Sequence, residues 1–361
     1  MRFYGREREL QLMEHLYART PSFLVVTGRR RVGKTELVKE FCKGKTALYF
    51  YVDGNKSIEV LIEEFGRLTA ETLNLPGYIK IDSPETFLEF LFSYNQPLIV
   101  VFDEFQRFQK VHPSFISQMQ RFWDQKGRDS HLFVIVSGSS IGMIREIFLG
   151  GDAPLFRRAD NILTLHPFKP KECLAILEEI GVRDPAERLD LYLLFGGTIY
   201  YYTFIEKYEC TDLETALDRL VLDDLAPLRR EMSDVMIEEF GREHATYYEI
   251  LAAIAQGKET QKEIADVVRL PSTSLPPYLR PCRPPRGHRL PPSGHRKREA
   301  FEDGQIHLCG QLLAVLRPLH IPEYEPLRER PFRPLKRPDP PGVEGVLRPG
   351  LRGDDPNPPR P

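Results

Sequence analysis

The stretch Gly28-Arg29-Arg30-Arg31-Val32-Gly33-Lys34-Thr35 decides the fold of this chain. It fits the pattern GxxxxGK[ST] and directly follows the apolar run 23–27, which predicts a buried β-strand. Residues 36–41 then show the apolar spacing of a helix. A strand, a glycine-containing loop and a helix start form the context in which this pattern cradles phosphate. The sequence therefore predicts a nucleoside triphosphate site.

The residue types in this loop each suit a phosphate ligand. Backbone N–H groups would surround the phosphates at the positive end of the following helix. Lys34 would reach the β- and γ-phosphates, and the Thr35 hydroxyl would hold Mg²⁺. Glycine is expected where a side chain would obstruct the anion or require an unfavourable φ. We predict that the nucleotide-binding residues are Gly28, Arg29, Arg30, Arg31, Val32, Gly33, Lys34, Thr35 and Glu36.

A second motif lies about 70 residues further on, where the apolar run 98–102 is followed by Asp103 and Glu104. This order is typical of a Walker B strand. Asp103, at the carboxyl end of a central strand, can hold the Mg²⁺ hydration shell beside Thr35. Glu104 can polarise the attacking water as a general base. A strand that merely ends in an acidic turn is the structural alternative, and the upstream phosphate loop favours catalysis.

Length and composition exclude several classes of protein. The 361 residues are enough for two or three domains, and the net charge of −2 gives no general attraction to nucleic acid or anionic membranes. No apolar run is long enough to span a membrane, and residues 1–7 lack the apolar region of a signal peptide. The scattered cysteines argue against zinc or disulfides and favour a reducing cytoplasm. These are Cys42, Cys173, Cys210, Cys282 and Cys309.

The chain divides into four segments. Residues 1–168 are the predicted α/β core, with further strands at 47–52, 131–136 and 162–165 and helices at 58–73, 84–93 and 115–126. Four helices are expected in a lid over 169–240, with the run 196–202 between two of them. Residues 241–280 predict a helix-turn-helix, with helices at 247–255, from 260 and from 272. This is part of a winged helix, which serves either DNA contact or protein packing.

The last segment, 281–361, has a different composition. Of the 31 prolines, 21 lie from Pro271 onward, and residues 281–361 carry a net charge of +5. A disordered Pro-rich linker is one interpretation. Out-of-frame translation of GC-rich DNA is the other, and we favour it because the break interrupts the third helix before any wing. We assign no function to this tail.

Residues 3 to about 280 resemble the archaeal and thermophile ATPases of the AAA+/STAND type. The resemblance rests on Gly5-Arg6-Glu7, the loop 28–35, the strand ending Asp103-Glu104, and the winged-helix pattern. It implies a three-layer α/β/α P-loop core with strand order 5-1-4-3-2, a helical lid and a winged helix. It also implies Mg²⁺-dependent hydrolysis of ATP rather than GTP, with the Gly-Arg-Glu segment closing over the adenine. Nothing after residue 280 matches the nuclease-like domain that many members carry.

The resemblance adds candidates for catalysis beside Lys34 and Glu104. The polar residue that contacts the γ-phosphate or lytic water would be Ser137 first and Ser139 second, with a solvent-facing turn as the alternative. Arg157 and Arg158 resemble an arginine finger, whose guanidinium neutralises charge on the transferred phosphoryl group. Surface pairing with Asp152 or Asp160 is the alternative for both arginines.

Three functions are compatible with these residues. A molecular switch or motor ATPase is favoured, because a water-activating Glu104 has no use in a kinase. A DNA-binding regulator with incidental hydrolysis is second, and a P-loop kinase is third because no acceptor pocket can be located. The expected partners are ATP and Mg²⁺, with duplex DNA, a second copy of the chain and a protein client as further candidates; no membrane partner is expected.

Overall fold

The computed structural model describes residues 2–139, 141–149, 151–258 and 260–279. These residues belong to one compact unit. The predicted tail 281–361, with both of its interpretations, lies outside them. Among the residues that the structure describes, no helix combines the length and apolar character needed to cross a membrane.

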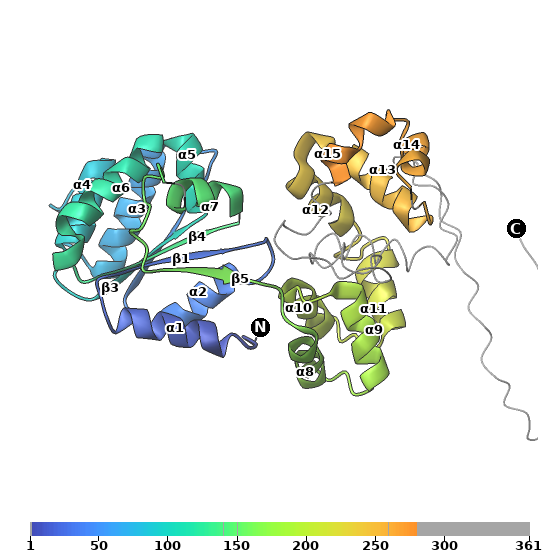
Figure 1. Ribbon diagram of the computed structural model, residues 1–361. Helices are drawn as coiled ribbons and strands as arrows, with labels where there is room; N and C mark the ends of the chain where they lie inside the picture. The colour runs from blue at the N-terminus through green and yellow to red at the C-terminus, as the bar shows by residue number, and fades with distance from the viewer. Residues whose placement is uncertain (1, 140, 150, 259, 280–361) are drawn as a thin grey trace, which may run out of the picture. The chain divides into compact units, whose positions relative to one another are not determined.

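A five-stranded sheet forms the centre of the α/β core (Figure 1). Its order is β2-β3-β4-β1-β5 and all of its pairings are parallel, so the order that the resemblance implied is confirmed. Because β4 lies between β1 and β3 and all three are parallel, their carboxyl ends lie side by side at the same edge of the sheet. The strands are β1 (Ser22–Gly28), β2 (Ala47–Tyr51), β3 (Leu98–Asp103), β4 (Leu132–Gly138) and β5 (Asn161–Leu165).

Helices cover both faces of the sheet, which gives three layers (Figure 1). Side chains alternate across a strand, so Phe23 and Val25 enter one core while Leu24 and Val26 enter the other. Trp123 packs against Phe23 with ring centroids 5.0 Å apart. One face carries α1 (Glu7–Tyr17) and α2 (Lys34–Cys42); the other carries α3 (Ile58–Leu73), α4 (Pro84–Ser93), α5 (Phe108–Val111), α6 (Pro113–Lys126) and α7 (Ile141–Phe148).

The helical segment after the core differs from its prediction. Residues 170–240, all of which the structure describes, form five α-helices and a π-helical turn at Asp218–Leu222, where four helices were expected. The run 196–202 is not a connection throughout, because α10 begins at Ile199. Burial of Tyr201 and Tyr202 outweighs the strand preference of tyrosine. The helices are α8 (Pro170–Ile180), α9 (Pro185–Phe195), α10 (Ile199–Lys207), α11 (Leu213–Leu217) and α12 (Glu231–Phe240).

The helix-turn-helix begins with α13 (His244–Ala255) and α14 (Gln261–Val268). The predicted capping box is present: Thr260 accepts from the backbone of Glu263, whose carboxylate accepts from the Thr260 N–H. The third helical segment begins where it was predicted, with a 3₁₀ turn at Ser272–Ser274 followed by α15 (Pro276–Leu279), the last of the described residues. A wing would lie outside the described residues, so the winged helix and the domain boundaries stay predictions.

Candidate nucleotide-binding site

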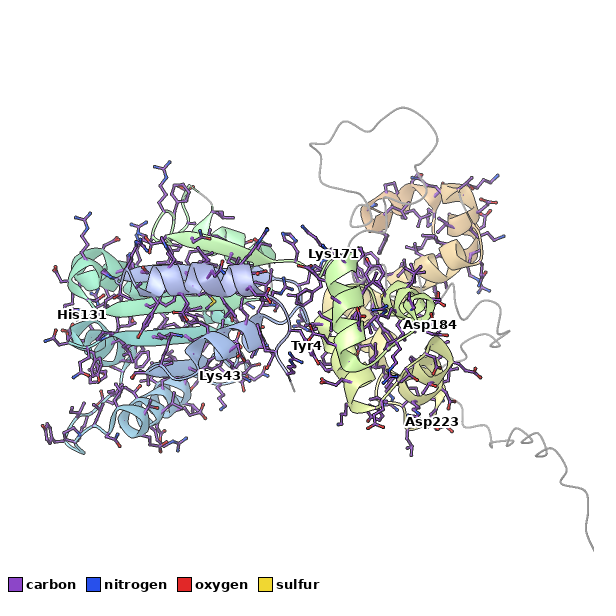
Figure 2. All side chains as sticks on the ribbon, turned by 90° about the horizontal axis from the view of Figure 1, so that it is seen from below. Tyr4, Lys43, His131, Lys171, Asp184 and Asp223 are labelled. Carbon is purple, nitrogen blue, oxygen red and sulfur yellow. The ribbon has the colours of Figure 1, made fainter. Side chains whose placement is uncertain are left out.

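The phosphate loop connects β1 to α2 at the carboxyl edge of the sheet. In Figure 2, Tyr4 lies at this edge and His131, which precedes β4, lies at the opposite one. Gly28 has φ +149°, and a Cβ on it would lie 2.4 Å from the Leu165 carbonyl oxygen. Gly33 has φ +94°. The first glycine is therefore required by the neighbouring strand β5, and the second by the backbone conformation.

Lys34 begins α2 and folds back over the loop. Its ammonium donates to the carbonyl oxygens of Gly28, at 2.9 Å, and Arg29, at 2.8 Å, and the side chain is buried. These contacts place a positive charge within the loop, beside the N-terminus of α2, where the partial positive charge of the helix adds to it. A positive charge at this place suits a phosphate group, and the role of Lys34 in binding it stays a prediction.

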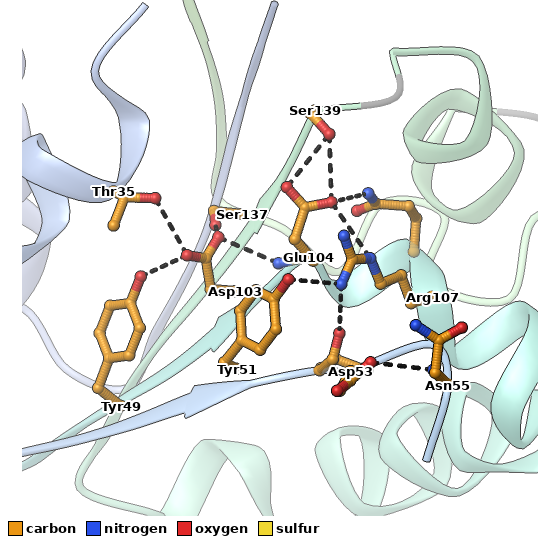
Figure 3. A network of polar contacts seen from close by, with 12 residues as sticks. Thr35, Tyr49, Tyr51, Asp53, Asn55, Asp103, Glu104, Arg107, Ser137 and Ser139 are labelled. Atoms are coloured by element: carbon orange, nitrogen blue, oxygen red, sulfur yellow. Dashed lines mark hydrogen bonds and ion pairs between the residues drawn. The ribbon is translucent and has the colours of Figure 1, made fainter. Parts of the chain in front are cut away.

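Asp103 ends β3 and is the centre of a buried polar network (Figure 3). The Thr35 hydroxyl donates to its Oδ2 atom at 3.1 Å, and the hydroxyls of Tyr49 and Ser137 donate to the same carboxylate. The backbone N–H of Glu104 donates to Oδ1 at 3.0 Å. Burial, together with the Asp103 charge, raises the pKa of Tyr49, so its phenol remains a donor. These four donors fix the direction of the Asp103 carboxylate.

Glu104 follows Asp103 in a left-handed conformation, with φ +58°. Such a conformation is uncommon for a non-glycine residue and is found where the surroundings hold it in place. Its carboxylate accepts from Gln106 Nε2 at 2.6 Å and from Ser139 Oγ at 3.1 Å, and Arg107 Nε lies 3.7 Å away. Glu104 is thereby directed away from the core and onto the site.

A cavity of about 580 Å³, here called the phosphate-end cavity, opens beside this network. Glu104, Arg107 and Ser139 line one part of it, and Arg31, Lys34 and Thr35 line another. The predicted loop and the predicted base therefore share one space.

A second cavity of about 200 Å³ shares Gly33 and Glu36 with the first. Phe3, Tyr4 and Phe168 give it an aromatic lining. Charged side chains, among them Arg6 of the Gly-Arg-Glu segment, complete the lining. Aromatic rings beside charged groups suit a nucleoside with its phosphates, and the position of this segment over the adenine stays a prediction.

The serine candidates take different positions. Ser137 is 1% exposed and donates to Asp103, whereas Ser139 lines the phosphate-end cavity and donates to Glu104. Ser139, the second choice, is thus the serine that faces the cavity, and Ser137 orients the Asp103 carboxylate.

The arginine candidates lie elsewhere. Arg158 makes two hydrogen bonds to Asp124 on α6, at 3.1 and 2.9 Å, and these raise the pKa of the guanidinium. The surface pairing expected for Arg158 is therefore with Asp124, and not with Asp152 or Asp160. The Asp160 carboxylate accepts a hydrogen bond from the Phe23 N–H. Arg157 is exposed, with φ +58°. Neither arginine lines the two cavities.

The residues fit a magnesium ion that is brought by a phosphate ligand. Mg²⁺ is usually held by one or two side-chain oxygens, water and substrate phosphates rather than by a complete protein cage. Thr35 and Asp103 supply two such oxygens side by side. Within the described part of the chain, no group of three His, Cys, Asp or Glu side chains could hold a metal by itself.

Sequence reasoning missed Tyr49, Tyr51, Gln106 and Arg107. The last two follow Glu104 so closely that their position was a usable signal. The two tyrosines lie on β2 and meet β3 only through strand pairing, for example Tyr49 opposite Val101.

Residues 3–201 match a protein family described as an ATPase domain predominantly from Archaea. The match spans more than half of the chain, and the chain belongs to this family. It is 31% identical over 281 residues to an uncharacterized protein of Methanocaldococcus jannaschii, covering 77% of this chain and 60% of that protein. The chain thus spans about 60% of the length of that curated relative.

A Walker-type ATPase of Pyrococcus abyssi has a similar structure, with a TM-score of 0.56 and 21% identity. The likeness covers 77% of this chain and 88% of that one, and it shows a shared fold. Together with the family match, it identifies the nucleotide-binding core as an ATPase domain of the P-loop class.

Proposed function

We propose that this protein is a Mg²⁺-dependent ATP hydrolase that acts as a molecular switch. The observation that carries the proposal is an ion pair between Arg31 in the phosphate loop and Glu231, the first residue of α12. Because Arg31 also lines the phosphate-end cavity, the same side chain faces the nucleotide site and a helix outside the core.

Hydrolysis at this site needs few chemical parts. Lys34 neutralises phosphate charge, and Thr35 with Asp103 holds the metal. The bound Mg²⁺ supplies further charge neutralisation at the phosphate oxygens. Glu104 orients the attacking water and accepts its proton.

The Arg31–Glu231 pair is well supported on the helical side. Glu231 is 5% exposed, and the Tyr201 hydroxyl donates to its Oε1 atom at 2.7 Å. The Arg31 guanidinium lies 5.1 Å from the centroid of the Tyr200 ring. A buried carboxylate that loses its cation is destabilised strongly, so this contact is sensitive to any competitor for Arg31.

Phosphate oxygens are such a competitor. If a triphosphate draws the Arg31 guanidinium toward its phosphates, the contact between Arg31 and Glu231 weakens and the preferred position of α12 changes. This helix packs on α13 through Met236 and Leu251, so the change reaches the helix-turn-helix. Nucleotide state and helix position then have a coupling free energy, which is what a switch requires.

The test compares the full-length chain with its variants Glu231→Gln and Lys34→Ala. Glu178→Gln is the control, because it removes the charge of an exposed carboxylate that also forms an ion pair. Glu178 pairs with Arg188 at 2.7 Å on the surface. ATP affinity and turnover are measured together. We expect Lys34→Ala to abolish turnover, Glu231→Gln to raise ATP affinity several-fold, and Glu178→Gln to change neither. A folded Glu231→Gln variant with unchanged ATP affinity would refute the coupling but not the ATPase.

A DNA-binding regulator is the second candidate. It is favoured by three consecutive helical elements around their own core, in which Ile250, Ile264 and Leu275 are buried. Duplex binding that weakens with salt and changes with ATP would support it. Turnover indifferent to duplex DNA would direct the search to a protein partner.

A further inference from the structure

We propose that Arg107 is a positioning residue for hydrolysis, which fixes the Glu104 carboxylate by anchoring it to the end of β2. The inference rests on the proposed role of Glu104 as the base. Arg107 belongs to the 3₁₀ turn Phe105–Arg107 that follows the Walker B strand, and it lines the phosphate-end cavity. Figure 3 shows its guanidinium between Glu104 and Tyr51.

The two ends of the guanidinium have different partners. Nη1 donates to the Tyr51 hydroxyl at 2.6 Å and to the Val52 carbonyl oxygen at 3.3 Å, whereas Nε lies 3.7 Å from Glu104 Oε2. The guanidinium is planar and rigid, so fixing one end also orients the other. Arg107 thus connects Glu104 to the end of β2, whereas the hydrogen bonds of the Glu104 carboxylate come from Gln106 and Ser139.

Packing holds Arg107 in this position. Its guanidinium lies 5.1 Å from the centroid of the Tyr51 ring, and its Cδ atom would be 3.4 Å from a Cβ placed on Gly54. Tyr51 is 50% exposed, which is unusual for a ring of this size, and the stacked guanidinium accounts for its position at the rim. Contacts with residues 51–54 therefore hold the Arg107 side chain in one position.

The charge pattern explains why a cation is needed here. Asp103 and Glu104 are adjacent carboxylates, and the side-chain partners of Asp103 are the hydroxyls of three neutral residues. Among the described residues, Arg107 provides the ion pair to this acidic pair within 4.0 Å. It offsets the repulsion between the two carboxylates and supports the left-handed backbone at Glu104.

The experiment uses the full-length chain with Arg107→Ala, Arg107→Lys, Tyr51→Phe and the double change Arg107→Ala/Tyr51→Phe. Arg121→Ala is the matched control, because Arg121 forms a surface ion pair with Glu85 at 2.8 Å and also lies over an aromatic ring. Steady-state turnover, ATP affinity and thermal unfolding are measured for each protein.

We expect Arg107→Ala to lower kcat by about 10- to 100-fold while ATP affinity changes less than about threefold, as for other residues that orient a reacting group. Arg107→Lys should recover little, since an ammonium cannot contact both Tyr51 and Glu104. Tyr51→Phe should lower kcat less, and the double variant should be no slower than Arg107→Ala, because both changes break one connection. Arg121→Ala should have the same kcat and ATP affinity as the unchanged protein.

Unchanged kcat in Arg107→Ala, equal losses of affinity and kcat, or additive effects of the two changes would each overturn the inference. Tyr51→Phe keeps the test decisive if Arg107→Ala does not fold, because it removes one exposed hydroxyl. Glu104→Gln separates this inference from the proposed function: if that variant loses turnover and Arg107→Ala does not, Arg107 alone has been misassigned. If Glu104→Gln keeps turnover, the base itself is wrong.

Discussion

The Thr35 hydroxyl donates to Oδ2 of Asp103 at 3.1 Å, although 68 residues separate them in the chain. This contact joins the start of α2 to the end of β3. It puts the two predicted magnesium ligands side by side, and Thr35 lines the phosphate-end cavity. Three predictions concern this site, and a fourth concerns the arginines outside it.

The first prediction concerns metal dependence. Asp103→Asn replaces an acceptor of four donors with an amide, so it removes the charge that attracts Mg²⁺ and disturbs the hydroxyl network. We expect the Mg²⁺ concentration for half-maximal turnover to rise at least about tenfold. Thr35→Ser, which keeps the hydroxyl, is the control and should raise this Mg²⁺ concentration far less. A Mg²⁺ titration of turnover measures both, and equal titration curves for Asp103→Asn and the unchanged protein would remove Asp103 from the metal site.

The second prediction separates binding from hydrolysis. Glu104→Gln keeps the size of the side chain and its contact with Ser139, but an amide cannot accept the proton of the attacking water. We expect turnover to fall by about 10²- to 10⁴-fold with ATP affinity preserved. Single-turnover hydrolysis and equilibrium binding measure the two effects, and undiminished turnover would refute the general base.

The third prediction concerns the glycine that opens the loop. Gly28→Ala brings a Cβ to 2.4 Å from the Leu165 carbonyl oxygen, so β1 or β5 must shift. We expect unfolding free energy to fall by about 1–3 kcal/mol, as in overpacked sites, with weaker ATP binding. Gly44→Ala is the control, because Gly44 also has a positive φ, +72°, but a Cβ there meets nothing within 4 Å. Denaturant unfolding of both variants checks the difference, and equal losses would show that φ rather than the strand contact matters at Gly28.

The fourth prediction concerns the two arginines after α7. Arg158 is already held by Asp124, so we expect Arg158→Ala to leave turnover unchanged and to cost at most about 1 kcal/mol of stability. Arg157 is exposed, and if it acts as a finger on a second copy of the chain, Arg157→Ala should lower turnover at concentrations where subunits associate. Specific activity measured over a range of protein concentrations is the readout. A flat dependence on concentration would exclude a finger acting in trans.

Local sequence patterns predicted much of the core. The strand at 98–102 and the strand before Gly28 were visible because parallel strands buried on both faces consist of unbroken apolar residues. The helix at 58–73 was predicted with its observed bounds from apolar spacing. Local residue preference was less informative where it opposed burial, since the tyrosine run at 200–202 is part of helix α10. Helix α7, which lies between two stretches containing glycine, was not predicted.

The sequence by itself determined the phosphate loop and the Walker B carboxylates, because each is encoded in a short contiguous motif. Only the tertiary structure decided which side chains support those motifs. Tyr49 reaches Asp103 through strand pairing, Arg107 reaches Tyr51 from a turn, and Glu231 reaches Arg31 from a helix 200 residues away. Such contacts depend on how strands and helices pack in space, and residue order along the chain carries no local signal for them.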